Sequence, residues 1–224
     1  FFKSYSSSDR TRSFLKIQDG CDYKCTFCTI PMARGNSRNQ SIKDTITEAK
    51  TIINSGVNEI VLTGVNIGDF GKTTGENFLD LLEALEKINI DFRIRISSIE
   101  PNLLTKKIID FICNSSKIVP HLHIPLQSGS KKILKLMKRR YNKDKYYDRI
   151  NYIKKKNPDI CIGADVIVGF PGEDDNDFFE TYDFIKSMDL SYLHVFSYSN
   201  RENTKSINML NQNDPKIIKE RRLT

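Results

Sequence analysis

Three cysteines near the start of the chain have a spacing that can hold a metal cluster. Cys21, Cys25 and Cys28 stand in the string GCDYKCTFC, a CxxxCxxC pattern. Three thiolates can hold three corners of a cubane 4Fe-4S cluster, which leaves one iron without a protein ligand. An open iron can bind and reduce a small molecule, whereas a fully ligated cluster only passes electrons. The triad therefore predicts an enzyme with a reactive iron site, in which these three cysteines are the metal ligands and the catalytic residues.

Two other uses of the cysteines have to be weighed. A disulfide framework is disfavoured because the chain has an odd number of cysteines, five, and its first residues show no signal-peptide pattern. A structural zinc site usually has four ligands, often as two CxxC pairs. The nearest other cysteine is Cys113, and no histidine lies close in sequence. Zinc with a distant fourth ligand stays the alternative to an iron–sulfur cluster.

Length and composition limit the class of protein. The 224 residues fit a single α/β domain, and a hydrophobic content of 38% is enough for a core. The sequence has no apolar run of about 18 residues, so we expect a cytoplasmic protein without a membrane span. The net charge of +7 suits a polyanionic partner such as RNA. The chain is also rich in Lys, Asn and Ile throughout, so compositional bias explains the charge equally well.

Strand-like and helix-like patterns alternate along the chain. The two kinds of segment are distinguished by the helical spacing of apolar residues, by capping residues and by β-branched runs. The expected strands are 13–18, 59–65, 92–99, 121–127, 161–170 and 192–199. The expected helices are 41–55, with Ser41 as N-cap and Gly56 as its end, 77–88, 105–114, one broken basic helix over 131–138 and 143–156, and 174–188.

Six such repeats predict a parallel sheet with right-handed crossovers, and so a partial TIM-like (β/α)6 barrel. In parallel barrels the chemistry lies at the C-terminal ends of the strands. The cysteine triad directly follows the first expected strand, where such a site belongs. We expect the barrel to cover residues 13–205. Residues 1–12 read as a linker from a missing N-terminal domain, and 206–224 as the start of a connection to a missing C-terminal RNA-binding domain.

A CxxxCxxC loop after the first strand of a barrel resembles the radical S-adenosylmethionine superfamily. The stretch KIQDGCDYKCTFCTIPMARGNSR looks like the cluster loop of the tRNA methylthiotransferases. RISSIEP, LHIPLQSGS, LKLMKRRY, DVIVGFPGE and LHVFSYSNRENT each resemble a further segment of that family, in the right order. SSIEP and FSYSNRENT are most similar to the MtaB-like branch, which acts on threonylcarbamoyladenosine.

The resemblance implies a reaction and its participants. The open iron would bind S-adenosylmethionine, and reductive cleavage would give a 5′-deoxyadenosyl radical for methylthiolation at carbon 2 of an adenosine beside the anticodon. The implied partners are the tRNA anticodon loop and an electron donor such as flavodoxin or ferredoxin. Such enzymes carry a second 4Fe-4S cluster in an N-terminal domain, so we expect it only in the full-length protein. The alternatives are a methylthiotransferase for a ribosomal protein side chain or for isopentenyladenosine, and a non-enzymatic zinc-holding RNA-binding module.

The same resemblance suggests cofactor-binding positions at the ends of the strands. Phe27 would pack over the cluster and the adenine, and Gly64 would expose backbone to the amino group of the cofactor. Glu100 ends the third strand as a candidate hydrogen-bond acceptor, although a solvent-facing carboxylate is the plain alternative. The remaining candidates are Gln127 and Ser128 for the ribose, Arg140 for a carboxylate or phosphate, and Val168 and Gly169 against the adenine.

Other residues have plainer interpretations. Arg140 belongs to the run Lys138-Arg139-Arg140, and charge runs are usually solvated faces. Arg34 and Arg38 can hydrogen-bond an anionic group or form a solvated basic loop. Cys113 and Cys161 are isolated, so we expect both to be small buried hydrophobic residues.

Overall fold

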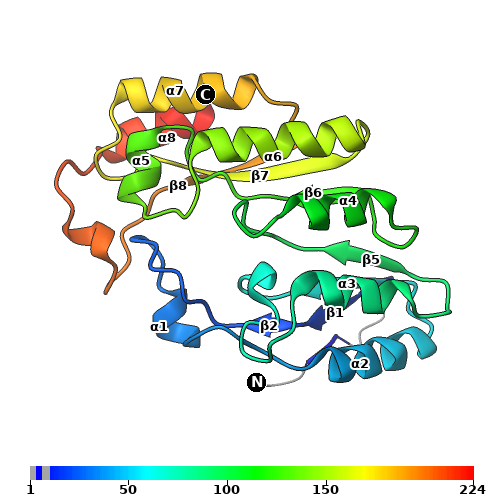
Figure 1. The fold of residues 1–224 in the computed structure, drawn as a ribbon. Helices are drawn as coiled ribbons and strands as arrows, with labels where there is room; N and C mark the ends of the chain where they lie inside the picture. Colours follow the sequence, from blue (N-terminus) through cyan, green and yellow to red (C-terminus); the bar gives the residue numbers. More distant parts are fainter. Residues whose placement is uncertain (1–3, 7–10) are drawn as a thin grey trace. The chain divides into compact units, whose positions relative to one another are not determined.

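The computed structural model describes residues 4–6 and 11–224 (Figure 1). The expected linker over 1–12 therefore lies partly outside the described residues. The chain divides into two compact units. The first is Phe1–Asp22 with Ile30–His123, and the second is Tyr23–Thr29 with Ile124–Thr224.

The first unit is built on a parallel sheet. Its strands are β1 (Ser13–Lys16), β4 (Glu59–Thr63) and β5 (Arg93–Ile96), in the order β1-β4-β5. Leu15 pairs with Leu62, and Leu62 pairs with Ile96, so buried side chains form a row across the sheet. The chain beyond β5 continues this pattern, because Ser98 forms a parallel bridge to His123 at the end of β6 (His121–His123).

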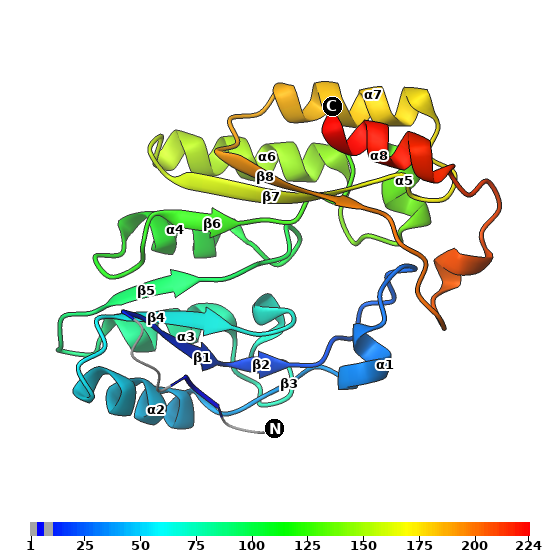
Figure 2. The ribbon, with the colours of Figure 1, turned by 180° about the vertical axis from the view of Figure 1, so that it is seen from behind.

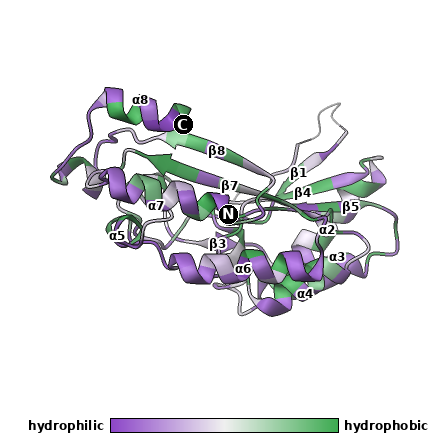
Figure 3. Cartoon of the chain, turned by 90° about the horizontal axis from the view of Figure 1, so that it is seen from above, coloured by the Kyte–Doolittle hydropathy of each residue, from purple (hydrophilic) through white to green (hydrophobic). Residues whose placement is uncertain are grey.

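Three amphipathic helices follow these strands (Figure 3). They are α2 (Ile42–Asn54), α3 (Phe78–Glu86) and α4 (Lys106–Asn114). Ser41 caps α2 as predicted, and Thr105 caps α4, since each hydroxyl accepts a hydrogen bond from the third residue beyond it. The chain leaves α2 at Gly56, whose φ of +91° suits glycine. The short helices α1 (Ile30–Arg34) and η1 (Ile67–Asp69) follow β2 and β4 in the chain.

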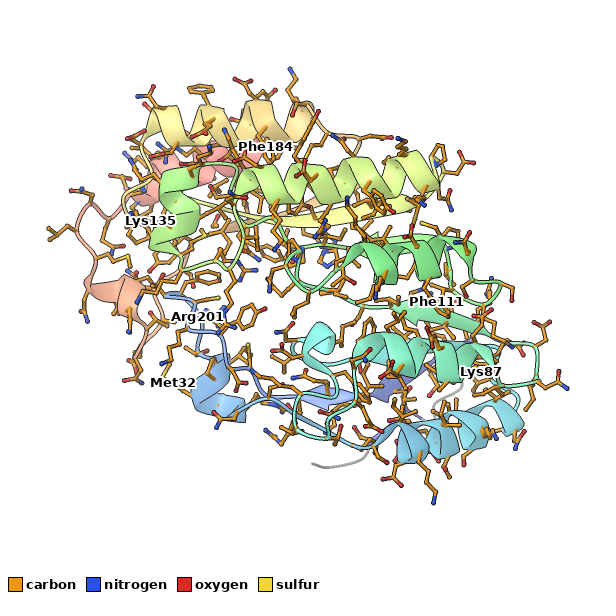
Figure 4. All side chains as sticks on the ribbon, viewed as in Figure 1. Met32, Lys87, Phe111, Lys135, Phe184 and Arg201 are labelled. Carbon is orange, nitrogen blue, oxygen red and sulfur yellow. The ribbon has the colours of Figure 1, made fainter. Side chains whose placement is uncertain are left out.

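The second unit contains β7 (Cys161–Val168) and β8 (Tyr192–Ser197), which pair in parallel with Asp165 opposite His194. Residues 124–127 extend this pairing, because Ile124 and Leu126 donate backbone hydrogen bonds to Gly163 and Asp165. The helices α6 (Lys143–Lys156), α7 (Asp175–Lys186) and α8 (Pro215–Leu223) lie beside these strands (Figures 1 and 2). Phe184 of α7 packs against Tyr146 of α6 with ring centroids 6.4 Å apart (Figure 4).

Several expected boundaries need correction. The first strand is two elements, because the chain changes partner after β1. β2 (Gln18–Asp19) pairs antiparallel with β3 (Arg38–Asn39). The broken basic helix is two separate helices, α5 (Lys131–Leu136) and α6, and Lys138 between them takes a left-handed φ of +56°. Only His121–His123 of the fourth expected strand forms β6, and β8 ends at Ser197. The short helix η2 (Lys205–Asn208) precedes α8.

Within residues 4–6 and 11–224, no helix combines the length and the apolar character needed to cross a membrane.

Candidate metal centre

Gln18 holds the chain just before the first cysteine. Its side chain is fully buried, and its amide nitrogen donates to the Gly20 carbonyl at 2.8 Å and to Ser37 Oγ at 2.9 Å. Its Oε1 accepts hydrogen bonds from the backbone N–H groups of Val65 at 3.0 Å and Asn66 at 2.7 Å. One satisfied side chain thus joins β2 to the loop after β4. No motif marks Gln18 in the sequence, where its only signal is a polar residue in an apolar strand.

Asp19 forms ion pairs with the two arginines that follow the loop. Arg34 Nε and Nη2 each lie 2.9 Å from one of its oxygens, and Arg38 Nη2 donates at 3.0 Å. Burial by itself would raise the pKa of the Asp19 carboxyl, but the hydrogen bonds from Arg34 and Gly20 and the charges of Arg34 and Arg38 outweigh it and lower the pKa. The anionic group expected for these arginines therefore lies within the chain.

Gly20 lets the chain turn into the cysteine loop, residues 20–29. Its φ is +71°, and a Cβ on this residue would lie 2.0 Å from the Asn36 carbonyl oxygen. Cys21 then donates its backbone N–H to the Gly35 carbonyl at 3.0 Å. Both contacts set the direction in which the first thiol leaves the sheet.

We expect Gly20→Ala to lower the free energy of unfolding by more than about 2 kcal/mol, because it adds a backbone clash to a left-handed conformation that costs about 1–2 kcal/mol. The control is Gly75→Ala, since Gly75 has a similar φ of +77° with no atom within 4 Å of the added Cβ. Urea unfolding measures both variants. Equal losses in the two would show that the contact with Asn36 has no energetic role.

The other part of the loop, Tyr23–Thr29, is anchored within the second unit. Thr26 donates its backbone N–H to the Met137 carbonyl at 3.2 Å and its hydroxyl to the Leu136 carbonyl at 2.9 Å, and it accepts from Ser206 N at 2.9 Å. Phe27 packs against Ile133, Met137 and Phe170, with its ring edge-to-face on Phe170 at 6.2 Å. Phe27 is thus a hydrophobic anchor, and its contact with a cofactor stays a prediction.

The thiols of the loop suit a metal cluster. Cys21, Cys25 and Cys28 are half-buried, and none of the five cysteines forms a disulfide in the described structure. The backbone folds tightly between two of them, because Cys28 N donates to the Cys25 carbonyl at 3.2 Å. Arg139 Nη1 lies 3.2 Å from Cys25 Sγ. Accessible soft donors with a cation beside one of them fit a thiolate-bound iron–sulfur cluster.

The two remaining cysteines differ from the expectation. Cys113 on α4 and Cys161 at the start of β7 are half-buried and not fully buried. Cys161 stands at the N-terminal end of its strand, eight residues from Gly169 at the other end. The prediction of buried hydrophobic residues was therefore wrong in degree for both.

Two candidate residues lie in the first unit. Gly64 follows β4 and is exposed, and a Cβ on it would lie 2.9 Å from both the Gln18 carbonyl oxygen and Ile67 Cγ2. Glycine is thus needed there for close packing, whatever it binds. Glu100 is half-buried, and its carbonyl oxygen accepts hydrogen bonds from Leu103 and Leu104 at 3.0 and 3.1 Å. A cofactor role for either residue stays a prediction.

Three further candidates lie in the second unit on or beside β7. Gln127 takes a φ of +65° and exchanges backbone hydrogen bonds with Asp165 and Ile167. Val168 is buried at the end of the strand. Gly169 donates its N–H to Glu173 Oε1 at 2.8 Å, and an added Cβ would lie 2.4 Å from Ile218 of α8. These residues therefore lie at the strand end as expected from the sequence, with Ile218 of α8 beside Gly169, and their contact with a cofactor stays a prediction.

Ser128 requires a correction. Its side chain is fully buried, its Oγ lies 3.1 Å from Thr181 Oγ1, and the Ser130 N–H donates to it at 3.1 Å. These bonds use the hydroxyl to attach the loop to α7. The placement gives no support to the predicted hydrogen bond from Ser128 to a ribose.

The sequence suggested a binding role for Arg140 and none for Arg139, but in the structure Arg139 lies beside Cys25 of the loop. The exposed guanidinium of Arg140 stacks 4.0 Å above the ring of Tyr23. Arg139, which had no assigned role, is the residue that reaches a cysteine sulfur. Both arginines belong to one basic run, so only the turn after α5 distinguishes them.

Comparison with known proteins identifies the family. Residues 15–185 match the profile of the radical SAM superfamily. The chain belongs to this superfamily. The match spans the cysteine loop and runs into α7.

Named relatives narrow the resemblance. The chain is 46% identical over 216 residues to the threonylcarbamoyladenosine tRNA methylthiotransferase MtaB of Bacillus subtilis, covering 96% of this chain and 48% of the relative. It is 40% identical to the tRNA-2-methylthio-N(6)-dimethylallyladenosine synthase of Alkaliphilus oremlandii, covering 94% and 45%. The predicted resemblance to methylthiotransferases of the MtaB branch is thus confirmed. The chain spans about half the length of the curated relatives it matches.

Solved structures share the fold. The radical S-adenosylmethionine methyltransferase TsrM from Kitasatospora setae superposes with a TM-score of 0.73 at 13% identity, covering 87% of this chain and 38% of that one. Coproporphyrinogen III oxidase from Escherichia coli, a radical SAM enzyme, gives a TM-score of 0.68 at 18% identity, covering 94% and 50%. These matches confirm the predicted α/β class, the partial TIM-like barrel of radical SAM enzymes.

Proposed function

We propose that this chain is the radical-generating core of a tRNA methylthiotransferase. The observation that carries the proposal is the cysteine loop: a CxxxCxxC triad with half-buried thiols, placed after the first parallel strand, in a chain 46% identical to a methylthiotransferase. A 4Fe-4S cluster held by these three cysteines would supply the electron for reductive cleavage of S-adenosylmethionine.

The chain's own residues would hold and orient this chemistry. Cys21, Cys25 and Cys28 are the proposed ligands. Gln18 and the Asp19–Arg34 pair fix the loop where it leaves the sheet, and Thr26 and Phe27 fix its other half. Gly64, Glu100, Gln127, Arg140, Val168 and Gly169 are the proposed contacts for S-adenosylmethionine.

The proposed substrate is carbon 2 of a threonylcarbamoyladenosine beside the tRNA anticodon. The relatives from Bacillus subtilis and Aquifex aeolicus, at 46% and 42% identity, carry this substrate in their names. An enzyme for dimethylallyladenosine is the second candidate, because a relative of that name is 40% identical. A methylthiotransferase for ribosomal protein uS12 is 38% identical and is the third. A second cluster and a flavodoxin-type or ferredoxin-type electron donor belong to the full-length enzyme in this proposal.

The basic helices α5 and α6 can present only some of their lysine charges to a phosphate backbone, because ion pairs within the chain use others. Lys132 lies 2.8 Å from Asp174, and Lys154 lies 3.1 Å from Asp189. Lys131 lies 3.4 Å from Asp144, whereas Lys135, which Figure 4 labels on α5, and Lys155 are exposed. Any RNA affinity from such contacts is expected to fall as salt is added.

We expect the anaerobically reconstituted and reduced chain to take up about four irons and to cleave S-adenosylmethionine slowly to 5′-deoxyadenosine. Chromatography of the products measures the cleavage, and mass spectrometry of tRNA nucleosides measures methylthiolation, which should need the full-length protein. Colourless protein holding one zinc per chain would reject the proposal. Full methylthiolation by this chain alone would show that the sulfur chemistry needs no second cluster.

A further inference from the structure

Arg139 makes a contact that the proposed function does not use. Its Nη1 lies 3.2 Å from Cys25 Sγ, and its Nε donates to Tyr141 Oη at 3.2 Å. The side chain is half-buried. Because the guanidinium group keeps its charge at every pH at which the protein folds, it is a permanent cationic donor to a thiolate.

Tyr141 holds this guanidinium in place. The tyrosine is buried, and its hydroxyl lies 2.9 Å from the Pro125 carbonyl oxygen and 2.8 Å from that of Leu126. Its single O–H can donate to either of these carbonyls, and its oxygen accepts from Arg139 Nε. The guanidinium carbon also lies 5.1 Å from the centre of the Tyr141 ring. Arg139 is therefore attached at one end to the backbone that runs beside β7.

The sulfur end of the contact is equally constrained. Lys138 takes a left-handed conformation, and Arg139 N donates to the Leu134 carbonyl at 3.0 Å, so the turn after α5 points the arginine out of the helix. Thr26, next to Cys25, bonds to the carbonyls of Leu136 and Met137 in the same turn. Two separate anchors thus bring the donor and the thiol together.

We propose that Arg139 sets the reduction potential of the cluster held by Cys25 through a charge-assisted hydrogen bond to the cysteine sulfur. This inference rests on the proposed function. Reduction adds negative charge to a cluster and its sulfur ligands, and hydrogen bonds to those sulfurs favour the reduced state. Arg139 therefore raises the potential and makes the cluster easier to reduce. Arg140 stacks instead on the ring of Tyr23, so we assign this role to Arg139 alone.

The test is a potentiometric titration of the anaerobically reconstituted chain, followed by electron paramagnetic resonance without S-adenosylmethionine. We expect R139Q to lower the equilibrium constant for one-electron reduction about tenfold, which is a shift of about 59 mV to more negative potential. K138Q is the matched control. It removes the same charge one residue away on an exposed side chain and should change the constant less than twofold. Y141F should shift the potential in the same direction by a smaller amount.

Several outcomes would overturn the inference. An unchanged potential in R139Q with weaker binding of S-adenosylmethionine would make Arg139 a ligand of that molecule. Equal shifts of the potential in R139Q and K138Q would show that only the loss of one positive charge matters, and not the hydrogen bond. If R139Q fails to assemble a cluster, Y141F decides, because this variant loses the anchor of Arg139 and a potential equal to that of the wild type would reject the role of the positioned hydrogen bond. Failure of the unaltered chain to bind iron would instead reject the proposed function.

Discussion

Replacement of Cys25 by Ala is expected to abolish both iron uptake and cleavage of S-adenosylmethionine. Only two thiolates remain in the loop of this variant, and two protein ligands are too few to hold a cubane cluster that has one open iron. The loss should be at least about a thousandfold in rate, because catalysis depends on the cofactor. Iron and sulfide analysis, visible absorbance and the yield of 5′-deoxyadenosine measure the effect.

The matched controls are Cys113→Ala and Cys161→Ala, which remove half-buried thiols from α4 and β7. Both should keep the full iron content and the cleavage rate. Retained cleavage in the Cys25 variant, or iron loss in either control, would refute the ligand assignment.

Replacement of Arg221 by Met is expected to cost about 3–5 kcal/mol in free energy of unfolding, because it leaves a buried carboxylate without its cation. Arg221 of α8 is 7% exposed, and its guanidinium contacts Glu173 Oε1 at 2.8 Å and Asp175 Oδ1 at 2.7 Å. Glu173 Oε1 also accepts the Gly169 N–H at the end of β7. The ion pair therefore attaches α8 to the strand end that carries candidate cofactor residues.

The pH dependence of this loss has a definite sign. Burial raises the pKa of Glu173 above its ordinary value, although the Gly169 N–H and Arg221 act against it. Without Arg221 the pKa rises further. The folded state then holds a proton that the unfolded state has released, so stability falls as pH rises between the two pKa values. Urea unfolding should show a larger loss for Arg221→Met at pH 8 than at pH 5.

Arg222→Met supplies the control, because it removes an exposed arginine from the same helix and should change stability by less than about 0.5 kcal/mol. The double variant E173Q/R221M removes the unpaired charge and should be more stable than R221M alone. A loss in R221M no larger than in the control would show that the buried pair adds nothing.

Local signals in the sequence were enough for the elements and for the family. Alternating apolar patterns and capping residues predicted most of the strands and helices to within a few residues, and Ser41 and Gly56 have their predicted roles, whereas α1 and α8 are not among the expected helices. Short-range rules succeed there because each element's ends depend on residues within one turn. The expected strand over 13–18 failed because its change of partner depends on Arg38 and Asn39, about twenty residues away.

The same contrast between short-range and long-range signals applies to the residues of the candidate site. Cys21, Cys25 and Cys28 could be assigned from spacing alone, because three ligands in one loop need no distant partner. Gln18, Arg139 and the Glu173–Arg221 pair could not, because their long-range partners lie 19 to 114 residues away in the chain. The sequence by itself therefore determined the superfamily and was enough to propose the three cysteines as ligands. Only the tertiary structure decided which arginine reaches Cys25 and that the Ser128 hydroxyl is turned inward, since long-range hydrogen bonds leave no periodic pattern in the chain.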